Sequence, residues 1–177
     1  GPLIDAMGAV PEAWHVRVPA VVPRRLVASP LPPSNLDADV INALLEAGAV
    51  VLCAGGGGIP VASGKSGFDG VEAVIDKDRV SSLIAQSIGA NLLLISTAID
   101  AIRLDFGKPS ERKIRNFSVS DATSHLDEGQ FPSGSMGPKV EAMLAAKQND
   151  PEMVVVLCQP GQALPAIRGE AGTTITN

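Results

Sequence analysis

The sequence predicts an α/β protein in which helices cover a buried, largely parallel β-sheet. Hydrophobic residues make up 45% of the 177 residues but aromatic residues only 3%, so aliphatic side chains must fill the interior, as they do where helices pack on a parallel sheet. Segments with helical periodicity also alternate with apolar segments of strand length, which is the order of a fold with helices on both faces of one sheet. A chain of this length is expected to form one domain.

Charge and cysteine usage restrict the classes of partner. The formal net charge of -5 provides no basic face for nucleic acid or for an acidic membrane surface, and no apolar run reaches the roughly 18 residues that a membrane span needs. Cys53 and Cys158 lie in apolar, strand-like runs, which favours reduced core cysteines over a disulfide. We therefore expect a cytoplasmic protein with no nucleic-acid and no membrane partner.

The first 33 residues differ from the rest because they are rich in proline. They contain one short alternating stretch, His15-Val16-Arg17-Val18, which predicts at most an edge strand. Periodic patterns begin at about residue 34. We therefore expect an irregular segment over residues 1–33 and a regular αβα domain over residues 34–177.

The predicted domain begins with a helix and a strand whose ends are marked by a capping residue and by glycines. Residues 35–47 begin with a capping residue, carry an apolar stripe and end at Gly48, which predicts a helix, and the apolar run 49–54 predicts a strand. The strand ends in Gly55, Gly56, Gly57 and Gly58. Such glycines either let backbone amides approach an anion or form a tight connection, and the glycines alone do not decide between the two.

A phosphate-binding loop of the Walker type is not predicted. Gly58 with Gly64-Lys65-Ser66 resembles that motif, but five residues rather than four separate the two glycines. Pro60 also stiffens the loop, and further glycines follow where a helix would have to begin.

The rest of the chain is predicted to alternate between helices and strands. Apolar spacing, capping residues and terminating glycines predict these elements. They are a helix over 76–88, a strand over 91–97, an edge segment over 99–107, a helix over 121–126 capped by Ser120, a helix with Pro138 in its first turn, a strand over 154–157, a helix over 163–167 and a strand over 173–176.

Lys77 and Lys139 stand at the starts of two predicted helices that follow glycine-bearing segments. A lysine there faces the positive end of the helix dipole, so an anion is needed to offset it. Two such lysines and two helix N-termini are what a phosphate site requires, with Asp76 and Asp78 orienting Lys77. The alternative is that Asp76 only caps its helix and that Lys77 is solvated.

Other chemistries find no support in the sequence. The two cysteines and two histidines have no zinc spacing, so we predict no metal site built from protein ligands. A Ser-His-Asp hydrolase is not indicated either, because Gly134-Ser135-Met136-Gly137 lacks the spacing of a nucleophile elbow.

Six blocks of the sequence carry a family resemblance, which becomes specific when they are taken together. They occur in the family's order and cover most of the chain from Arg24 onward. The blocks are residues 24–30, 54–61, 70–78, 104–109, 128–131 and 134–142. Through them the sequence resembles carbamate kinase, of the amino-acid kinase superfamily.

The resemblance implies a fold and an activity. The fold is a three-layer αβα sandwich with a mainly parallel sheet, the amino-acid kinase fold, and we expect its N-terminal part to be missing from this chain. The activity is reversible phosphoryl transfer between ATP and carbamate, in which carbamoyl phosphate and ADP give ATP and carbamate with Mg2+ as cofactor. The resemblance also implies a homodimer and a place in arginine or related nitrogen catabolism.

The resemblance assigns the site residues as well. Lys77, Asp78 and Lys139 serve the transferring phosphoryl group: Lys77 bridges it, Asp78 holds the lysines in place, and Lys139 binds the terminal phosphates of the nucleotide. The nucleotide-binding residues are Thr97, Asp100, Phe106, Gly107, Met136, Gly137 and Lys139, and the substrate-binding residues are Gly55, Gly56, Gly57 and Gly58.

The sequence also departs from the family pattern. The family's N-terminal half supplies further glycine-rich loops, and a lid supplies another lysine, neither of which is seen here. Asp105 stands where the family usually has Asn, and Arg79 and Arg103 replace commonly apolar or neutral residues. The sheet would have an open edge that a partner or the first 30 residues must cover.

These departures define the alternative hypothesis. It is a non-catalytic nucleotide-binding or dimerisation remnant, inactive without a separate N-terminal half. A different amino-acid kinase, acting on a carboxylate or a nucleotide monophosphate, is disfavoured by the block at residues 134–139.

Overall fold

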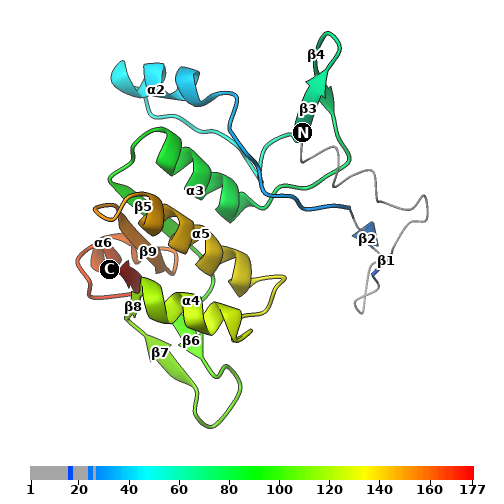
Figure 1. The fold of residues 1–177 in the computed structure, drawn as a ribbon. Helices are drawn as coiled ribbons and strands as arrows, with labels where there is room; N and C mark the ends of the chain where they lie inside the picture. Colours follow the sequence, from blue (N-terminus) through cyan, green and yellow to red (C-terminus); the bar gives the residue numbers. More distant parts are fainter. Residues whose placement is uncertain (1–15, 18–23, 26) are drawn as a thin grey trace.

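A four-stranded sheet forms the centre of the fold in the computed structural model, which describes residues 16–17, 24–25 and 27–177 (Figure 1). The strand order is β5-β9-β10-β8. The strands are β5 (Leu92–Ser96), β9 (Val154–Cys158), β10 (Thr173–Thr176) and β8 (Asn116–Ser118). The pairs β5–β9 and β10–β8 are parallel, and β9–β10 is antiparallel, so the sheet is mainly parallel, as predicted.

Helices cover both faces of this sheet and make the predicted three layers. One face carries α3 (Lys77–Ser87), α5 (Met136–Asn149) and α4 (Val119–Asp127), with α5 lying between the other two (Figure 1). The short α6 (Ala163–Ile167) packs against β9 from the other face. The αβα class inferred from alternating periodicity is therefore confirmed.

The main core lies between the sheet and α5. Val140 and Met143 of α5 and Val155 of β9 have no solvent exposure. Burial of one such side chain contributes about 1.5–3 kcal/mol relative to leaving it exposed. Because α3, α4 and the sheet all pack around α5, this helix fixes where the start of α3 lies relative to its own start.

The elements before β5 are more loosely attached. Helix α2 (Ala38–Glu46) packs on α3 through Ile41, which joins a small cluster with Ile75, Val80 and Ile84. Two hairpins project from the body of the molecule (Figure 1). One is formed by β3 (Val61–Gly64) and β4 (Gly67–Gly70), and the other by β6 (Ile102–Leu104) and β7 (Arg112–Ile114).

The predicted strand over residues 49–54 is wrong, because this segment has no strand partner among the described residues. Its apolar side chains are correspondingly exposed, with Val50 at 93% and Leu52 at 96%. Cys53 is likewise exposed and not a core residue, whereas Cys158 is buried as predicted.

Two local predictions are corrected by turn and cap geometry. The helix expected from residue 121 begins at Val119, so its cap is Ser118, whose Oγ accepts from the Asp121 N–H at 3.0 Å. The stretch Gly64-Lys65-Ser66 belongs to the β3–β4 hairpin, where Lys65 and Ser66 form the two-residue connection, and it is not a phosphate loop.

The predicted irregular segment over residues 1–33 falls mostly outside the described residues, and His15 and Val18 lie there. Within it, β1 (Val16–Arg17) pairs antiparallel with β2 (Arg24–Arg25). In the part of the chain that the structure describes, the helices are all too short or too polar to cross a membrane.

Candidate functional site

The N-terminus of α3 is fixed by a side-chain cap. The Oδ1 atom of Asp76 accepts hydrogen bonds from the backbone N–H groups of Asp78 at 2.9 Å and Arg79 at 3.2 Å. Such a cap satisfies donors that a helix start otherwise leaves unpaired. The prediction that Asp76 caps this helix is confirmed. The cap places Lys77 and Asp78 in the first turn of α3.

Asp78 joins the two lysines that the sequence singled out. Its Oδ2 atom accepts from Lys139 Nζ at 2.7 Å and from Lys77 Nζ at 3.2 Å. The Asp78 side chain is only 8% exposed and that of Lys139 12%, whereas that of Lys77 is 59% exposed. Lys139 is therefore not at an exposed helix start, because packing of α5 against α3 carries it inside.

The charges in this cluster keep Lys77 protonated. Partial burial lowers the pKa of Lys77, but the hydrogen bond to Asp78 and the charges of Asp78 and Asp76 outweigh burial, and the pKa is raised. Two ammonium groups share the Asp78 carboxylate here, and Asp76 adds a second negative charge beside Lys77. The exposed side of Lys77 is left for a further anion.

A second ion pair joins α3 to α5, and sequence reasoning missed it. Arg79 Nη2 donates to Glu141 Oε2 at 2.6 Å, while the buried Nε atom of Arg79 has no hydrogen-bond partner among the described residues. Arg79 and Glu141 each follow a lysine of the cluster by two residues. This equal spacing is visible in the sequence. It indicates an ion pair between Arg79 and Glu141 only when α3 and α5 are known to be neighbours.

The glycine loop lies directly beside the start of α3. A Cβ atom on Gly57 would lie 2.0 Å from the carbonyl oxygen of Ile75 and 3.6 Å from the backbone nitrogen of Lys77, and the φ angle of Gly57 is 137°. Only glycine suits this close approach and this backbone conformation. Gly55 and Gly58 also have positive φ angles of 48° and 80°.

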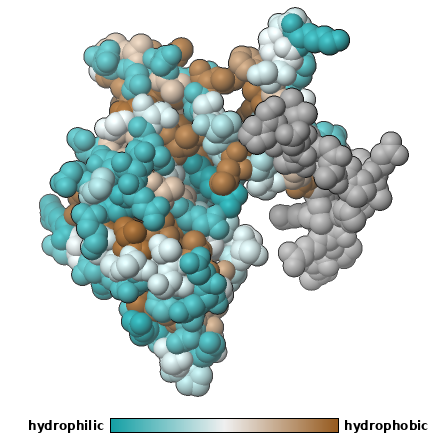
Figure 2. Space-filling view, viewed as in Figure 1, coloured by the Kyte–Doolittle hydropathy of each residue, from teal (hydrophilic) through white to brown (hydrophobic). Residues whose placement is uncertain are grey.

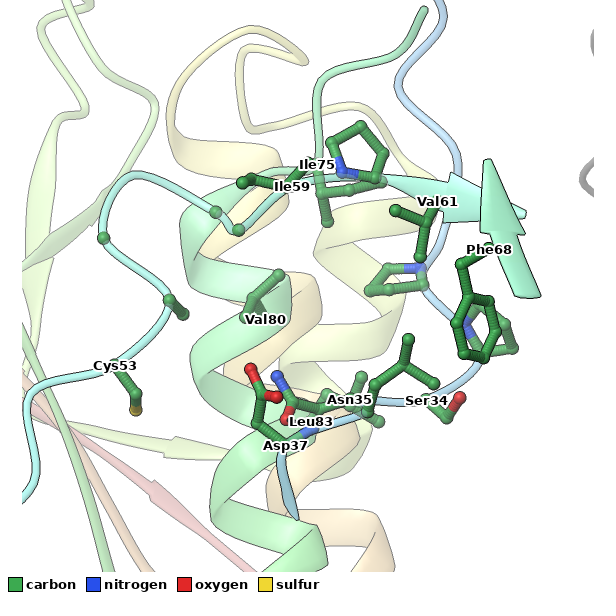
Figure 3. Close-up of a pocket in the computed structure, with 18 of the residues that line it drawn as sticks. Ser34, Asn35, Asp37, Cys53, Ile59, Val61, Phe68, Ile75, Val80 and Leu83 are labelled. Atoms are coloured by element: carbon green, nitrogen blue, oxygen red, sulfur yellow. Dashed lines mark hydrogen bonds between the residues drawn. The ribbon is translucent and has the colours of Figure 1, made fainter. Parts of the chain in front are cut away.

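A large, mainly apolar cavity of about 1010 Å³ lies on the other side of the glycine loop (Figure 3). All four glycines line it, together with Ile59, Val61 and Phe68, while Val80 and Leu83 contribute from α3. Asp37 is its one charged lining residue within the described part of the chain. Neither lysine of the cluster reaches this cavity, so it has no cation for a phosphate group.

The residues predicted to bind the nucleotide are dispersed over several elements. Thr97 follows β5, and its N–H donates to the carbonyl of Cys158 at 2.9 Å. Asp100 contacts Arg103 at 2.9 Å and also Lys113, and these hydrogen bonds lower the pKa of its carboxyl group.

Asp105, Phe106 and Gly107 lie at the tip of the β6–β7 hairpin. Phe106 is exposed, and the Gly107 N–H donates to Glu111 at 2.8 Å. Asp105 has a φ angle of 53°, a left-handed conformation that Asp and Asn both tolerate. The substitution for the usual Asn therefore suits the backbone. The ion pair with Lys108 at 3.0 Å lowers the pKa of the Asp105 carboxyl group.

Met136 and Gly137 begin α5, three and two residues before Lys139. Met136 is half-buried and packs against the main core. Gly137 is buried, and a Cβ atom there would come within 3.3 Å of the Pro132 carbonyl. Of the predicted nucleotide residues, these two share an element with a lysine of the cluster, while no hydrogen bond or ion pair among the described residues connects Thr97, Asp100 or Phe106 to it.

The described residues fit phosphate better than they fit a metal ion. They contain no group of three or more His, Cys, Asp or Glu side chains that could hold a metal, and Asp78 already accepts from two lysines. Mg2+ that accompanies a nucleotide is commonly held by one or two carboxylates and the phosphates themselves, and it does not need such a group. The exposed ammonium of Lys77 and the adjacent glycine loop suit an anion.

The three-layer αβα domain with a lysine cluster at two helix starts is an α/β protein with a candidate anion site. The profile of the amino acid kinase family matches residues 8–157. The chain therefore belongs to the amino acid kinase family.

Its relatives include several carbamate kinases. The chain is 39% identical over 152 residues to the carbamate kinase of Staphylococcus haemolyticus, covering 86% of this chain and 49% of that protein. It is 37% identical over 166 residues to that of Latilactobacillus sakei, covering 94% and 53%. The Giardia lamblia carbamate kinase structure bound to AMP-PNP has a TM-score of 0.86 at 33% identity, covering 99% of this chain and 55% of that one.

These comparisons confirm the predicted resemblance and the predicted fold. They also show that the chain spans about half the length of the curated relatives it matches. The described structure is accordingly the fold of one half of those proteins, with its own buried core.

Proposed function

We propose that this chain provides the phosphoryl-binding part of a carbamate kinase-type phosphotransferase. The reaction is carbamoyl phosphate and ADP giving carbamate and ATP, and its reverse. The observation that carries the proposal is the Lys77–Asp78–Lys139 cluster, in which one buried carboxylate holds two ammonium groups at the starts of α3 and α5. An isolated structural ion pair would need one lysine, whereas neutralising a phosphoryl group favours two.

Phosphoryl transfer depends on positioning and on balancing charge on the transferred group, with little covalent chemistry by the protein. Lys77, whose side chain is mostly exposed, is the lysine available to contact the transferred phosphoryl group. Lys139 is held inside by Asp78 and would bind the terminal phosphates of ATP or ADP from the start of α5. Asp78 is a positioning residue, because it touches both lysines and repels phosphate.

The other proposed roles follow from the family. Thr97, Asp100, Phe106, Gly107, Met136 and Gly137 would border the nucleotide, and Gly55 to Gly58 would face the carbamate. The protein would work as a cytoplasmic homodimer in arginine or related nitrogen catabolism. Mg2+ would accompany the nucleotide and lower the charge repulsion between its phosphates.

A second candidate function has its own support. The chain matches about half of each curated relative, and much of the apolar surface before β5 is exposed. A nucleotide-binding module that is inactive without a separate N-terminal half is consistent with both observations.

Calorimetric titration with Mg-ADP, followed by carbamoyl phosphate and an assay for ATP, separates the two candidates. ATP formation establishes the kinase, whereas ADP binding without turnover identifies the non-catalytic module. Lys77→Ala should weaken binding of AMP-PNP, which has a terminal phosphate in the position of the transferred group, about tenfold, corresponding to about 1.4 kcal/mol. Arg168→Ala is the matched control, because Arg168 is an exposed cation at the end of α6. Equal AMP-PNP affinity in both variants would contradict the lysine assignment.

A further inference from the structure

The start of α5 is held less firmly by its own residues than the start of α3. Asp76 caps α3 through two backbone N–H groups, whereas Ser135 at the N-cap of α5 makes no side-chain cap hydrogen bond, and the first turn of α5 holds no acidic residue. One backbone bond ties α5 to the preceding turn, from the Gly137 N–H to the Pro132 carbonyl at 3.0 Å. A helix start without a side-chain cap frays more readily, so contacts to neighbouring elements must hold it.

Two ion pairs provide such contacts between α5 and α3, which lie side by side (Figure 1). The first joins Lys139 to Asp78 at 2.7 Å, and the second joins Arg79 to Glu141 at 2.6 Å. Helix α3 supplies the acid of the first pair and the base of the second. A single pair fixes one distance between two helices, whereas two pairs at successive residues of α3 also oppose rotation and sliding of α5.

The lysine cluster depends on this arrangement of the two helices. Lys77 and Asp78 belong to α3, but Lys139 is carried by α5, and both lysines donate to Asp78 Oδ2. Figure 2 shows hydrophilic side chains at the surface around the start of α3, where the exposed Lys77 lies. A displacement of about 1 Å misaligns groups that must act on one ligand together. The two ammonium groups therefore converge only while α5 keeps its place.

Glu141 is the acceptor that holds the Arg79 side chain. Arg79 Nη2 donates to Glu141 Oε2, and the buried Nε atom of Arg79 has no hydrogen-bond partner among the described residues. The Arg79 side chain is 22% exposed. Separating a partly buried guanidinium from its acceptor leaves a charged group poorly solvated and without compensation. The pair is thus suited to keep α3 and α5 at a fixed spacing.

We propose that Arg79 and Glu141 are a positioning pair for the candidate anion site, which holds α5 so that the Lys139 ammonium stays beside that of Lys77. Both residues act through Lys139 and neither is assigned a contact with phosphate. The inference rests on the proposed function for the identity of the ligand, a nucleotide with a terminal phosphate. The placement of Lys139 is a property of the chain itself and can be measured without a ligand.

A purely electrostatic role of the pair predicts a different pattern. Arg79→Met removes a positive charge near the site and Glu141→Met removes a negative one. By charge alone, the first variant should weaken anion binding and the second should strengthen it. A positioning pair is broken equally by either change, so both variants should weaken binding.

The test combines calorimetric titration with AMP-PNP and the rate at which acetic anhydride acetylates Lys139, followed by mass spectrometry. Relative to the unmodified chain, Arg79→Met and Glu141→Met should each weaken AMP-PNP binding at least about threefold. Each should also speed acetylation of Lys139, now 12% exposed, at least about threefold relative to the exposed Lys65. Lys147, which is buried in the same helix, should keep its rate, because a general loss of structure would expose both lysines.

Two further variants make the test specific. The double variant Arg79→Met with Glu141→Met has the net charge of the unmodified chain but no pair, and it should be impaired as much as either single variant and no more. Arg103→Met is the matched control for acetylation. Arg103 pairs with Glu111 at the same distance, 2.6 Å, and with a similarly exposed side chain, but on the β6–β7 hairpin, so the Lys139 rate should not change.

Three results would overturn the proposal. One is a change of AMP-PNP affinity in opposite directions for the two single variants, which would assign the pair a role through charge. Another is a Lys139 rate that stays constant in both variants or rises together with that of Lys147. The third is a double variant whose loss equals the sum of the single losses, because two residues that act as one unit cannot be additive. If the unmodified chain binds no AMP-PNP, the proposed function fails, and the acetylation rates alone decide the positioning role.

Discussion

Residues 92–177 and residues 27–75 use similar apolar residues but pack them very differently. In the later region, Leu93, Val140 and Val155 are buried between the sheet and its helices. In the earlier region, only Ile41 and Ile75 among the described large apolar side chains are buried. Val50, Leu52 and others are exposed. Apolar sequence therefore leads to burial only where a facing surface exists.

The comparison is tested most strongly by removing one large apolar side chain from each region. Met143→Ala should lower the free energy of unfolding by about 2–5 kcal/mol, because the side chain is fully buried in α5. Leu52→Ala should change it by less than about 0.5 kcal/mol, because Leu52 is 96% exposed. Urea denaturation of the two purified variants and the unmodified chain measures both.

The contrast would disappear if both variants lost a similar amount of stability. Such a result would mean that Leu52 is covered in solution and that the two regions form one core. A change in the slope of the urea transition would have to be excluded first, since it signals a change in the denatured or native state instead of a simple loss of stability.

Helix positions followed from local sequence better than strand positions did. The predicted helix over residues 76–88 is α3, and its Asp76 cap formed as expected, because caps and apolar stripes act within one segment. The strand predicted at residues 49–54 failed because strands need a neighbour. The β3–β4 hairpin was not predicted, because its two-residue connection, Lys65-Ser66, lacks the Asn-Gly or Asp-Gly pair that marks most hairpin turns.

In the candidate site, too, local features could be predicted from the sequence and contacts between elements could not. The positions of Lys77 and Lys139 at two helix starts could be predicted, since a helix start is a local feature. That Asp78 contacts both lysines, and that Arg79 pairs with Glu141, depends on α3 lying beside α5. No spacing within one helix indicates a contact between two.

The two lysines allow a second comparison, between an inward and an outward member of one cluster. Lys139→Ala should lower the free energy of unfolding by about 1–3 kcal/mol, because it removes the closer partner of the buried Asp78 carboxylate. Lys77→Ala should cost less than about 0.5 kcal/mol, since Lys77 is 59% exposed and Lys139 still pairs with Asp78. Thermal or urea unfolding at neutral pH, with Arg168→Ala as the control, measures the difference.

A larger loss of stability for Lys77→Ala than for Lys139→Ala would reverse the assignment of inward and outward lysine. Weaker AMP-PNP binding by Lys77→Ala without loss of stability would agree with a ligand-binding role. The stability measurement is therefore needed before any change in affinity is interpreted.

The smallest expected effect separates surface charge from apolar burial in the well-packed region. Hydrogen bonds to Lys113 and then Arg103 lower the pKa of Asp100 from its ordinary value of 3.8. A carboxyl group with a lowered folded-state pKa contributes stability above about pH 4, and the contribution is lost as the pH falls through the folded-state pKa. Asp100→Asn should therefore cost no more than about 1 kcal/mol at pH 6, since the Asp100 side chain is 35% exposed and screened by solvent.

Urea unfolding of the unmodified chain and of Asp100→Asn at pH 6 and pH 3 checks both size and sign. The difference between the two proteins should shrink at the lower pH, because below pH 3.8 the Asp100 carboxyl of the unfolded chain takes up a proton while the paired carboxyl of the folded chain stays ionised, which favours unfolding. A difference that grows on acidification would contradict the lowered pKa. A difference at pH 6 as large as that for Met143→Ala would show that ion pairs on the β6–β7 hairpin, and not apolar burial alone, distinguish residues 92–177 from residues 27–75.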